Sequence, residues 1–476
     1  MREIPGDGII RPVTPLKNFA PGFVPSDSES PSAPRLERVI GVGGLGASAV
    51  NCIVGSGIFG LPGIAAAMLG PAAVLAYLLC AVLVGLVGLC LAEAGSRVSH
   101  PGGLYAYATA AFGPVVGGIA GTFLWFANSV VTSAAVANLL VDTLGMGIPA
   151  LGVGVWRFVA LVMLYAVFAG VNIRGARGGA RLSIVLAAVK IAPLVLLVIV
   201  GAFTVRISNL EWVAMPAASQ VGQTAVLLFF AFIGVEGGLN ASGEVSDPAR
   251  TVPRAIFLAL TLVAALYIGL QVVAQGVLGA GLADAPAPLV AAATAVFGPW
   301  GARLFWVTTV LSVTGFLSAD VLCSPRNLAA LAERRQLPRG LAAVHPRFKT
   351  PAIAIGIYAL MCAMVAVSGS FRYLVILGTS GTLVLYLICC LGLLRLRADG
   401  VATSGPPFRA PGGSLVPLAA SAIILWLLST LAWGELAAAL FMVIASGGVY
   451  ALRERWVRKR VGSIELRPAP AVRGLE

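Results

Sequence analysis

Two glycine-rich stretches interrupt apolar runs that are long enough to cross a membrane, at residues 55–60 (GSGIFG) and 234–238 (GVEGG). A bilayer tolerates broken helix only where protein or a watery cavity satisfies the freed backbone groups. Freed N–H groups at the start of the following half-helix suit a carboxylate, because the helix dipole is positive there. Packing of small residues between helices is the competing explanation for either stretch alone. The pair of breaks favours a transporter binding site.

Three charged residues fall inside apolar runs, where charge is costly and is normally paired, protonated or hydrated. Glu236 either carries a proton or braces the unwound segment by accepting backbone hydrogen bonds. Lys190 lies about 12 Å deep at 1.5 Å per residue, so we expect it to face inward, because snorkelling covers only part of that depth. Asp320 either pairs with Lys190 or lies hydrated near the cytoplasmic mouth.

The composition excludes a soluble fold. The 476 residues are 59% hydrophobic and 11% charged, and runs of about 20 apolar residues recur, the length that crosses a bilayer core. The net charge of +13 reflects Lys and Arg gathered in alternate loops and both tails, which predicts cytoplasmic termini rather than a nucleic-acid partner. The seven cysteines lack metal-site spacing and are expected to be small core residues, so we expect no metal and no cofactor.

The apolar pattern predicts an all-α polytopic membrane protein with 12 transmembrane helices. Residues 1–38 are expected to form a disordered cytoplasmic tail, and residues 453–476 a second cytoplasmic tail. Residues 39–205 and 206–397 each hold five spans, so the second unit must be inverted relative to the first. Two further spans in 398–452 would serve packing or homodimer contacts. The spans lie near 39–67, 71–94, 104–142, 152–172, 182–204, 221–243, 254–280, 301–332, 351–369, 372–396, 415–431 and 434–452.

The chain resembles the amino acid–polyamine–organocation superfamily of transporters over nearly all of residues 39–455. The order and spacing of five stretches carry the likeness: GSGIFGLP at 55–62, PGGLYAY at 101–107, FIGVE at 232–236, EVSDPARTVP at 244–253 and SPRNLAALA at 324–332. The resemblance implies a LeuT-type fold, a 5+5 inverted repeat with broken helices 1 and 6. It also implies alternating access to a central amino-acid site.

The resemblance further implies which residues bind substrate. Amides of the first break would hold the α-carboxylate, and carbonyls of the second would take the α-amino group. The implied substrate-binding residues are Val54, Gly55, Ser56, Gly57, Ile58, Ala127, Asn128, Thr132, Phe230, Ala231 and Ile233. Phe230 stands where the arginine/agmatine antiporter has a gating tryptophan, which weakens an arginine-specific interpretation. Tyr105 matches a family tyrosine on the cytoplasmic side of the path.

Lys190 matches a lysine that occupies the place of a sodium ion in cationic and heteromeric-type amino-acid transporters of the superfamily. Its expected partners are carbonyls freed at residues 55–57 and hydroxyls of span 8 such as Ser318. That contact would tie span 1 to span 8 and make transport independent of sodium.

We therefore predict a secondary transporter of the inner membrane that moves amino acids by alternating access, through proton coupling or exchange. A polyamine or other organic-amine carrier is one alternative, for which Asp320 and Glu236 are the available acidic partners. A non-transporting amino-acid sensor with the same fold is another. An enzyme is disfavoured, because the spans hold no cluster of His, Cys and carboxylate residues.

Overall fold

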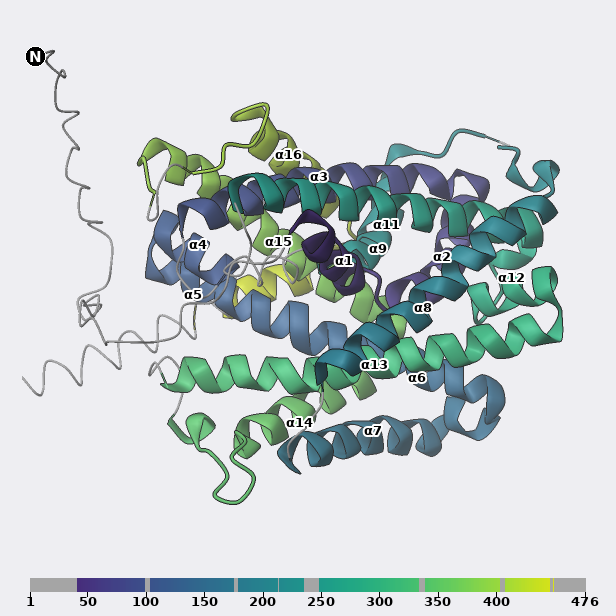
Figure 1. Cartoon of the computed structure of the whole chain (residues 1–476), viewed down its shortest axis with the longest axis horizontal. Helices are drawn as coiled ribbons and strands as arrows, with labels where there is room; N and C mark the ends of the chain where they lie inside the picture. The colour runs from purple at the N-terminus through teal and green to yellow at the C-terminus, as the bar shows by residue number, and fades with distance from the viewer. Residues whose placement is uncertain are drawn as a thin grey trace, which may run out of the picture.

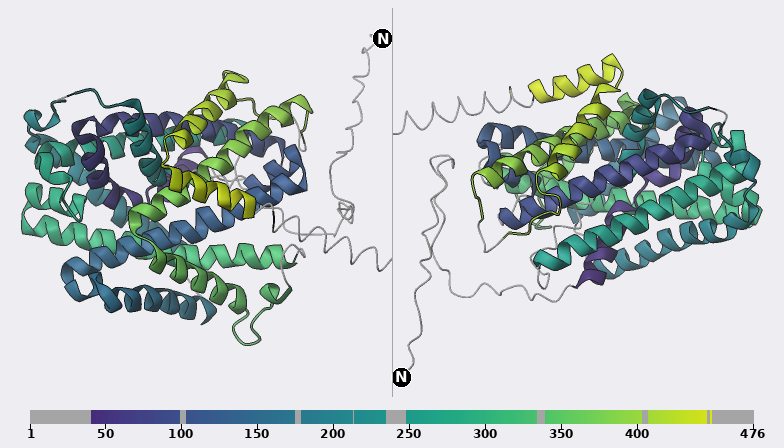
Figure 2. Two further views of the ribbon diagram at one scale, coloured as in Figure 1. Left: turned by 180° about the vertical axis from the view of Figure 1, so that it is seen from behind. Right: turned by 90° about the horizontal axis from the view of Figure 1, so that it is seen from above.

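The computed structural model describes residues 41–98, 103–174, 179–212, 214–234, 248–333, 339–402, 407–445 and 448, and every regular element in these ranges is helical. Figure 1 shows long helices that run side by side, with α3 and α11 along one edge and α7 and α14 along the other. Helices α6 and α13 lie between these pairs, and the further views agree (Figure 2). The all-α prediction is confirmed.

The principal helices have the following bounds: α1 (Val42–Ile53), α2 (Gly57–Leu69), α3 (Ala73–Arg97), α4 (Leu104–Phe112), α5 (Pro114–Thr122), α6 (Thr132–Gly147), α7 (Gly154–Arg174), α8 (Gly179–Gly201), α9 (Ala218–Phe229), α11 (Pro248–Leu278), α12 (Pro288–Phe297), α13 (Pro299–Glu333), α14 (Ala352–Ser368), α15 (Phe371–Ala398) and α16 (Leu415–Ser429). In the described part of the chain, six helical segments are long and apolar enough to cross a membrane: those that contain α3, α6, α7, α11, α13 and α15. Shorter apolar helices accompany them, and the chain is an integral multi-pass membrane protein.

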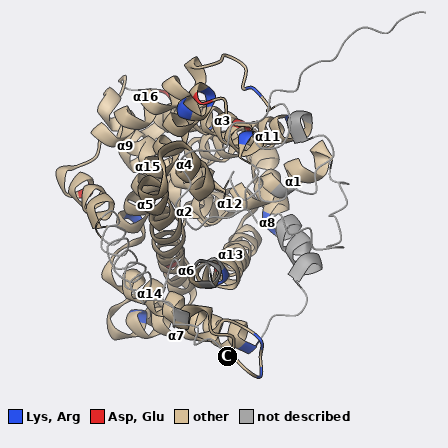
Figure 3. Ribbon diagram, turned by 90° about the vertical axis from the view of Figure 1, so that its left-hand side faces the viewer, with Lys and Arg blue, Asp and Glu red and all other residues tan. Residues whose placement is uncertain are grey.

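Charge is sparse along the helices and gathers where they end. Figure 3 looks along the helices from one end of the bundle, and its Lys and Arg residues lie mostly at helix ends and in connecting loops. This arrangement keeps most of the charge out of the apolar length of the bundle, where charge is costly.

Two segments differ from the predicted spans. The expected long span 104–142 is divided at Gly113, whose φ of +85° ends the nine-residue helix α4. The segment Pro114–Gly147 then runs on as one helix, with a π-helical stretch at Phe123–Val131 in its middle. The ten-residue helix α12, between the predicted spans 7 and 8, is a helix that the sequence pattern did not predict. Both predicted tails lie outside the described residues.

The first helix break is present in the structure, and the described residues of the second break end the preceding helix at the predicted place, while residues 235–238 lie outside the described part of the chain. Helix α1 ends at Ile53 and α2 begins at Gly57, so the chain leaves helical geometry between them. Helix α9 passes through one 3₁₀ turn, Phe230–Phe232, and reaches Gly234, whose φ is +120°. A Cβ on Gly234 would lie 2.8 Å from the Cys52 carbonyl oxygen, so this position needs glycine for both its backbone angle and its close approach. The two breaks therefore lie against each other.

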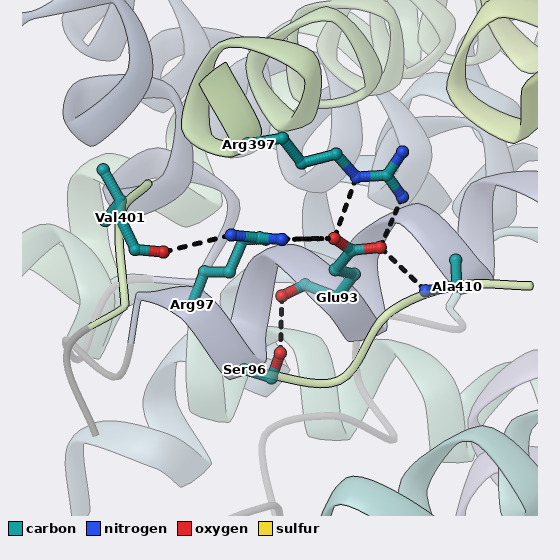
Figure 4. Close-up of polar contacts among 6 residues, drawn as sticks. All are labelled: Glu93, Ser96, Arg97, Arg397, Val401 and Ala410. Carbon is teal, nitrogen blue, oxygen red and sulfur yellow. Dashed lines mark hydrogen bonds and ion pairs between the residues drawn. The ribbon is translucent and has the colours of Figure 1, made fainter. Parts of the chain in front are cut away.

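A buried ion cluster joins the ends of α3 and α15 (Figure 4). The fully buried Glu93 accepts hydrogen bonds from Arg97 Nη2 at 2.8 Å, Arg397 Nη2 at 2.5 Å and the Ala410 amide at 2.8 Å. Arg97 also donates to the Val401 carbonyl at 3.2 Å. One carboxylate thus fixes two helix ends and the segment that leads to α16.

Replacing Glu93 by glutamine should lower the free energy of unfolding by about 3 kcal/mol, because two arginines would face each other without a counter-charge. The measurement is thermal unfolding of the purified protein in detergent. Asp399→Asn is the matched control, since the Arg395–Asp399 pair is exposed (57% and 41%) and exposed pairs contribute at most about 1 kcal/mol. Equal losses in both variants would contradict a stabilising role for the buried cluster.

Candidate functional site

A cavity of about 170 Å³ lies where the two breaks meet. It is lined by Cys52, Ile53, Gly55, Ser56, Gly57, Asn128, Thr132, Phe230, Ala231, Ile233, Gly234, Phe316 and Asp320. A larger hollow, of about 440 Å³, lies beside Gly113 and Arg395 and contacts neither break. The smaller cavity is the candidate site, because both breaks open onto it.

The start of α2 gives the cavity a positive end. Ser56 is 2% exposed and precedes the first residue of the 13-residue helix, Gly57. The first amides of a helix have no partner within the helix, and the dipole adds about half a positive charge there. An anionic group can therefore bind at this wall of the cavity through backbone N–H groups.

The second break packs tightly on Gly57. A Cβ at Gly57 would lie 3.0 Å from Phe230 Cδ1 and 3.1 Å from Ala231 Cα, so hydrogen alone fits at this point. The Phe230 ring meets the Phe371 ring edge-to-face, with 6.3 Å between centroids. Phe371 is the first residue of α15, so Phe230 joins the cavity wall to the beginning of that helix.

Tyr267 of α11 connects the two breaks. Its buried hydroxyl lies 3.1 Å from the Ile53 carbonyl oxygen and 3.1 Å from the Ala231 carbonyl oxygen. The Ala231 carbonyl, which we expected to receive the substrate amino group, therefore already has a donor within reach. Sequence reasoning missed Tyr267, and its only signal was a hydroxyl in the middle of an apolar run.

Lys190 lies on the side of α1. Its Nζ donates to the Asn51 carbonyl oxygen at 2.8 Å, which joins α8 to the last turn of α1. The expected bond to a carbonyl of span 1 is present, but it lies one turn before residues 55–57. Pairing with Asp320, one of the two alternatives for that residue, is not formed in this structure: Lys190 donates to Asn51, and Asp320 accepts hydrogen bonds from Ser324 and Tyr358.

The remaining expected residues divide by position. Val54, Ile58 and Ala127 are fully buried and are not among the residues that line the cavity. Ser318 is exposed on α13 and makes no described bond to Lys190. Tyr105 lies against α5, where a Cβ on Gly121 would be 3.0 Å from its ring, and is not part of the cavity wall. Glu236 lies outside the described residues.

Four lining residues were not predicted: Cys52, Ile53, Gly234 and Phe316. Cys52 and Ile53 end α1 immediately before the break, and Gly234 follows the 3₁₀ turn of the second break. Their sequence signal was their proximity to the glycine-rich stretches. Phe316 lies one turn before Asp320 on α13 and had no signal of its own, because aromatic residues are common in membrane-spanning helices.

These features define a multi-pass membrane protein with a small internal cavity between the break after α1 and the residues that follow α9. Such a site suits a solute carrier, because irregular backbone at membrane depth is tolerated only where it is buried or lines a cavity. Residues 44–450 match the amino acid permease family, and the chain belongs to that family. It is therefore a transporter and not an enzyme.

Named relatives include transporters of different solutes. The chain is 27% identical to a methylthioribose transporter of Bacillus subtilis, over 80% of this chain and 86% of that protein. It is 28% identical to the branched-chain amino acid permease BcaP of Lactococcus lactis, over 73% and 79% of the two chains. It is 29% identical to the serine/threonine exchanger SteT of Bacillus subtilis, over 64% and 71%. All three are similar across most of their length.

Proposed function

We propose that this protein carries a small α-amino acid across the inner membrane by alternating access and without sodium. The observation that carries the proposal is the cavity enclosed by both helix breaks, with the first amides of α2 on its wall. Those amides would bind the substrate carboxylate, as an anion binds at any helix N-terminus.

The size of the cavity supports a small substrate. A volume of about 170 Å³ is close to that of an engineered cavity of about 150 Å³ that holds one benzene molecule. Two relatives are named for branched-chain amino acids and for serine and threonine, all of which have compact side chains. We therefore assign compact neutral amino acids to this carrier.

Lys190 supports independence from sodium. Its ammonium contacts the Asn51 carbonyl at the end of α1 and so supplies a fixed positive charge beside the first break. A carrier that has this charge needs no bound cation at the same place. The proposed architecture has two five-helix units of opposite orientation and two further spans, twelve in all, with both termini in the cytoplasm. In the proposed cycle, the Phe230–Phe371 contact closes one side of the site.

Uptake of radiolabelled solutes into proteoliposomes tests the proposal. The panel contains leucine, valine, serine, threonine, arginine, putrescine and methylthioribose, with and without sodium and at two external pH values. Saturable uptake or exchange of compact neutral amino acids, unchanged by replacing sodium with choline, is the expected result. A response to the pH gradient would support proton coupling, with Glu236 as the proposed carrier, and obligatory counterflow would support exchange. Uptake of methylthioribose or putrescine alone would overturn the amino-acid assignment.

A further inference from the structure

Asp320 is the charged side chain of the cavity wall. The other lining residues in the described part of the chain are small, apolar or neutral polar, and none of them carries a charge. Asp320 lies in the middle of α13, far along the sequence from both breaks, yet it lines the same cavity of about 170 Å³. A carboxylate at membrane depth is costly and marks a functional position unless it is paired within the protein.

Hydroxyl groups hold Asp320 in position. Ser324 Oγ, one turn later on α13, donates to Oδ1 at 2.8 Å, and the Tyr358 hydroxyl of α14 donates to Oδ2 at 2.6 Å. Tyr358 is fully buried, and its ring lies 6.4 Å from that of Trp125. Ser133 of α6 is a third hydrogen-bonding neighbour of this carboxylate. A carboxylate has about four acceptor positions, so these three neighbours fix its orientation and leave capacity for one more donor.

The described residues give Asp320 no cationic partner. The ion pairs among them join Glu93, Asp142 and Asp399 to arginines, and Lys190 donates to the Asn51 carbonyl instead. Among the described residues, the carboxylate therefore has fixed neighbours that donate hydrogen bonds but none that neutralises its charge. A cation that enters the cavity would supply the missing charge.

We propose that Asp320 binds the ammonium group of the transported amino acid. This inference rests on the proposed function and names the group that recognises the amine. The cavity then offers backbone amides of α2 for the carboxylate and Asp320 for the ammonium, which together match a zwitterion. The Ala231 carbonyl of the second break already has the Tyr267 hydroxyl within reach. Asp320 therefore gives the ammonium group an acceptor besides the carbonyls of the second break.

The assignment makes a free amino group the main requirement of the substrate. Acylation of the amine removes its charge, and deamination removes the group, so both changes leave the half-buried Asp320 carboxylate without its proposed partner. The loss of a hydrogen bond to a charged group corresponds to about 10- to 100-fold in affinity. The side chain of the substrate should contribute less to the binding affinity, because the rest of the cavity wall is uncharged among the described residues.

Wild-type protein in detergent tests the requirement directly. Competition against the radiolabelled amino acid that the uptake panel identifies would compare that amino acid with its N-acetyl derivative, its deaminated acid and its primary amine without the carboxylate. We expect the N-acetyl derivative and the deaminated acid to bind at least about 10-fold more weakly than the amino acid. Equal binding of the N-acetyl derivative would overturn the proposal without any variant.

Asp320→Asn then assigns the requirement to this residue, because asparagine preserves the shape and removes the charge. We expect about 10- to 100-fold weaker binding of the amino acid and loss of the discrimination against the N-acetyl derivative. Tyr358→Phe keeps the carboxylate and removes one of its fixed donors, so it should weaken binding by only a few-fold and keep the discrimination. Asp284→Asn, at an exposed loop position, should leave both unchanged.

The outcomes separate this inference from the proposed function. If wild-type protein binds no amino acid but binds the primary amine in an Asp320-dependent way, the amino-acid assignment fails and the role of Asp320 stands. If Asp320→Asn keeps wild-type affinity and discrimination, the role of Asp320 fails and the amino-acid assignment stands. Unchanged binding with loss of the response to a pH gradient would make Asp320 a proton carrier and would also overturn the inference.

Discussion

Gly57→Val should abolish amino-acid uptake while the protein still reaches the membrane. A Cβ at this position would lie 3.0 Å from Phe230 Cδ1 and 3.1 Å from Ala231 Cα, and valine adds two further methyl groups at a rotationally stiff branch. Because one neighbour is backbone, the two breaks must move apart, and overpacking of this kind costs about 1–3 kcal/mol. The displaced amides would no longer meet the carboxylate. We expect uptake below about 5% of wild type. This loss of about 20-fold corresponds to a free energy within the range given for overpacking.

The matched control is Gly85→Val in α3, where no atom outside the neighbouring backbone of α3 lies within 4 Å of the position that a Cβ would take. This variant should keep near-normal uptake, since the added methyl groups meet open space. Binding of the radiolabelled substrate in detergent distinguishes a damaged site from a damaged transport cycle. Wild-type affinity in Gly57→Val would remove the first break from the substrate site.

The second large effect is expected at Lys190. Removing its ammonium in Lys190→Ala leaves the Asn51 carbonyl without the donor that lies 2.8 Å away and withdraws a positive charge from beside the first break. Hydrogen bonds to charged groups contribute about 1.5–3 kcal/mol, so uptake should fall by at least about 10-fold. The loss is expected at unchanged expression, and uptake by the wild type should be the same in sodium and in choline.

Arg303→Ala is the control for this prediction, because it removes an exposed cation near the first turn of α13. Its uptake should remain close to wild type. Strong stimulation of wild-type uptake by sodium, or near-normal uptake by Lys190→Ala, would overturn the assignment of Lys190 as the fixed charge beside the first break.

The positions of both breaks could be predicted from the sequence because their signal is local. Glycine residues inside an apolar run identify unwound backbone without knowledge of the neighbours, and Gly55, Ser56, Gly57 and Phe230 all line the cavity. The helix α12 was not predicted, because its ten residues are too few to be recognised as a membrane span from hydropathy. Local pattern thus indicated residues that line the cavity but not every helix around it.

The partners within the site depended on packing between distant segments. Nothing in the local pattern indicates that Tyr267 reaches both Ile53 and Ala231, or that Tyr358 reaches Asp320. Lys190 was expected at the break and contacts α1 one turn earlier, a difference that depends on how α8 crosses α1. Such relations follow from the angles and offsets between helices, which hydropathy does not encode.

The π-helical stretch Phe123–Val131 constrains how this region can vary among relatives. A π-turn contains about one residue more than an α-turn, so deleting a single residue here would restore an α-helix. Every later side chain would then rotate by about 100° around the axis. Asn138, whose Nδ2 donates to the Ala366 carbonyl at 2.9 Å, would face a different neighbour, and Thr132 would leave the cavity wall. Substitutions at this stretch are therefore easier to accommodate than a one-residue change in length.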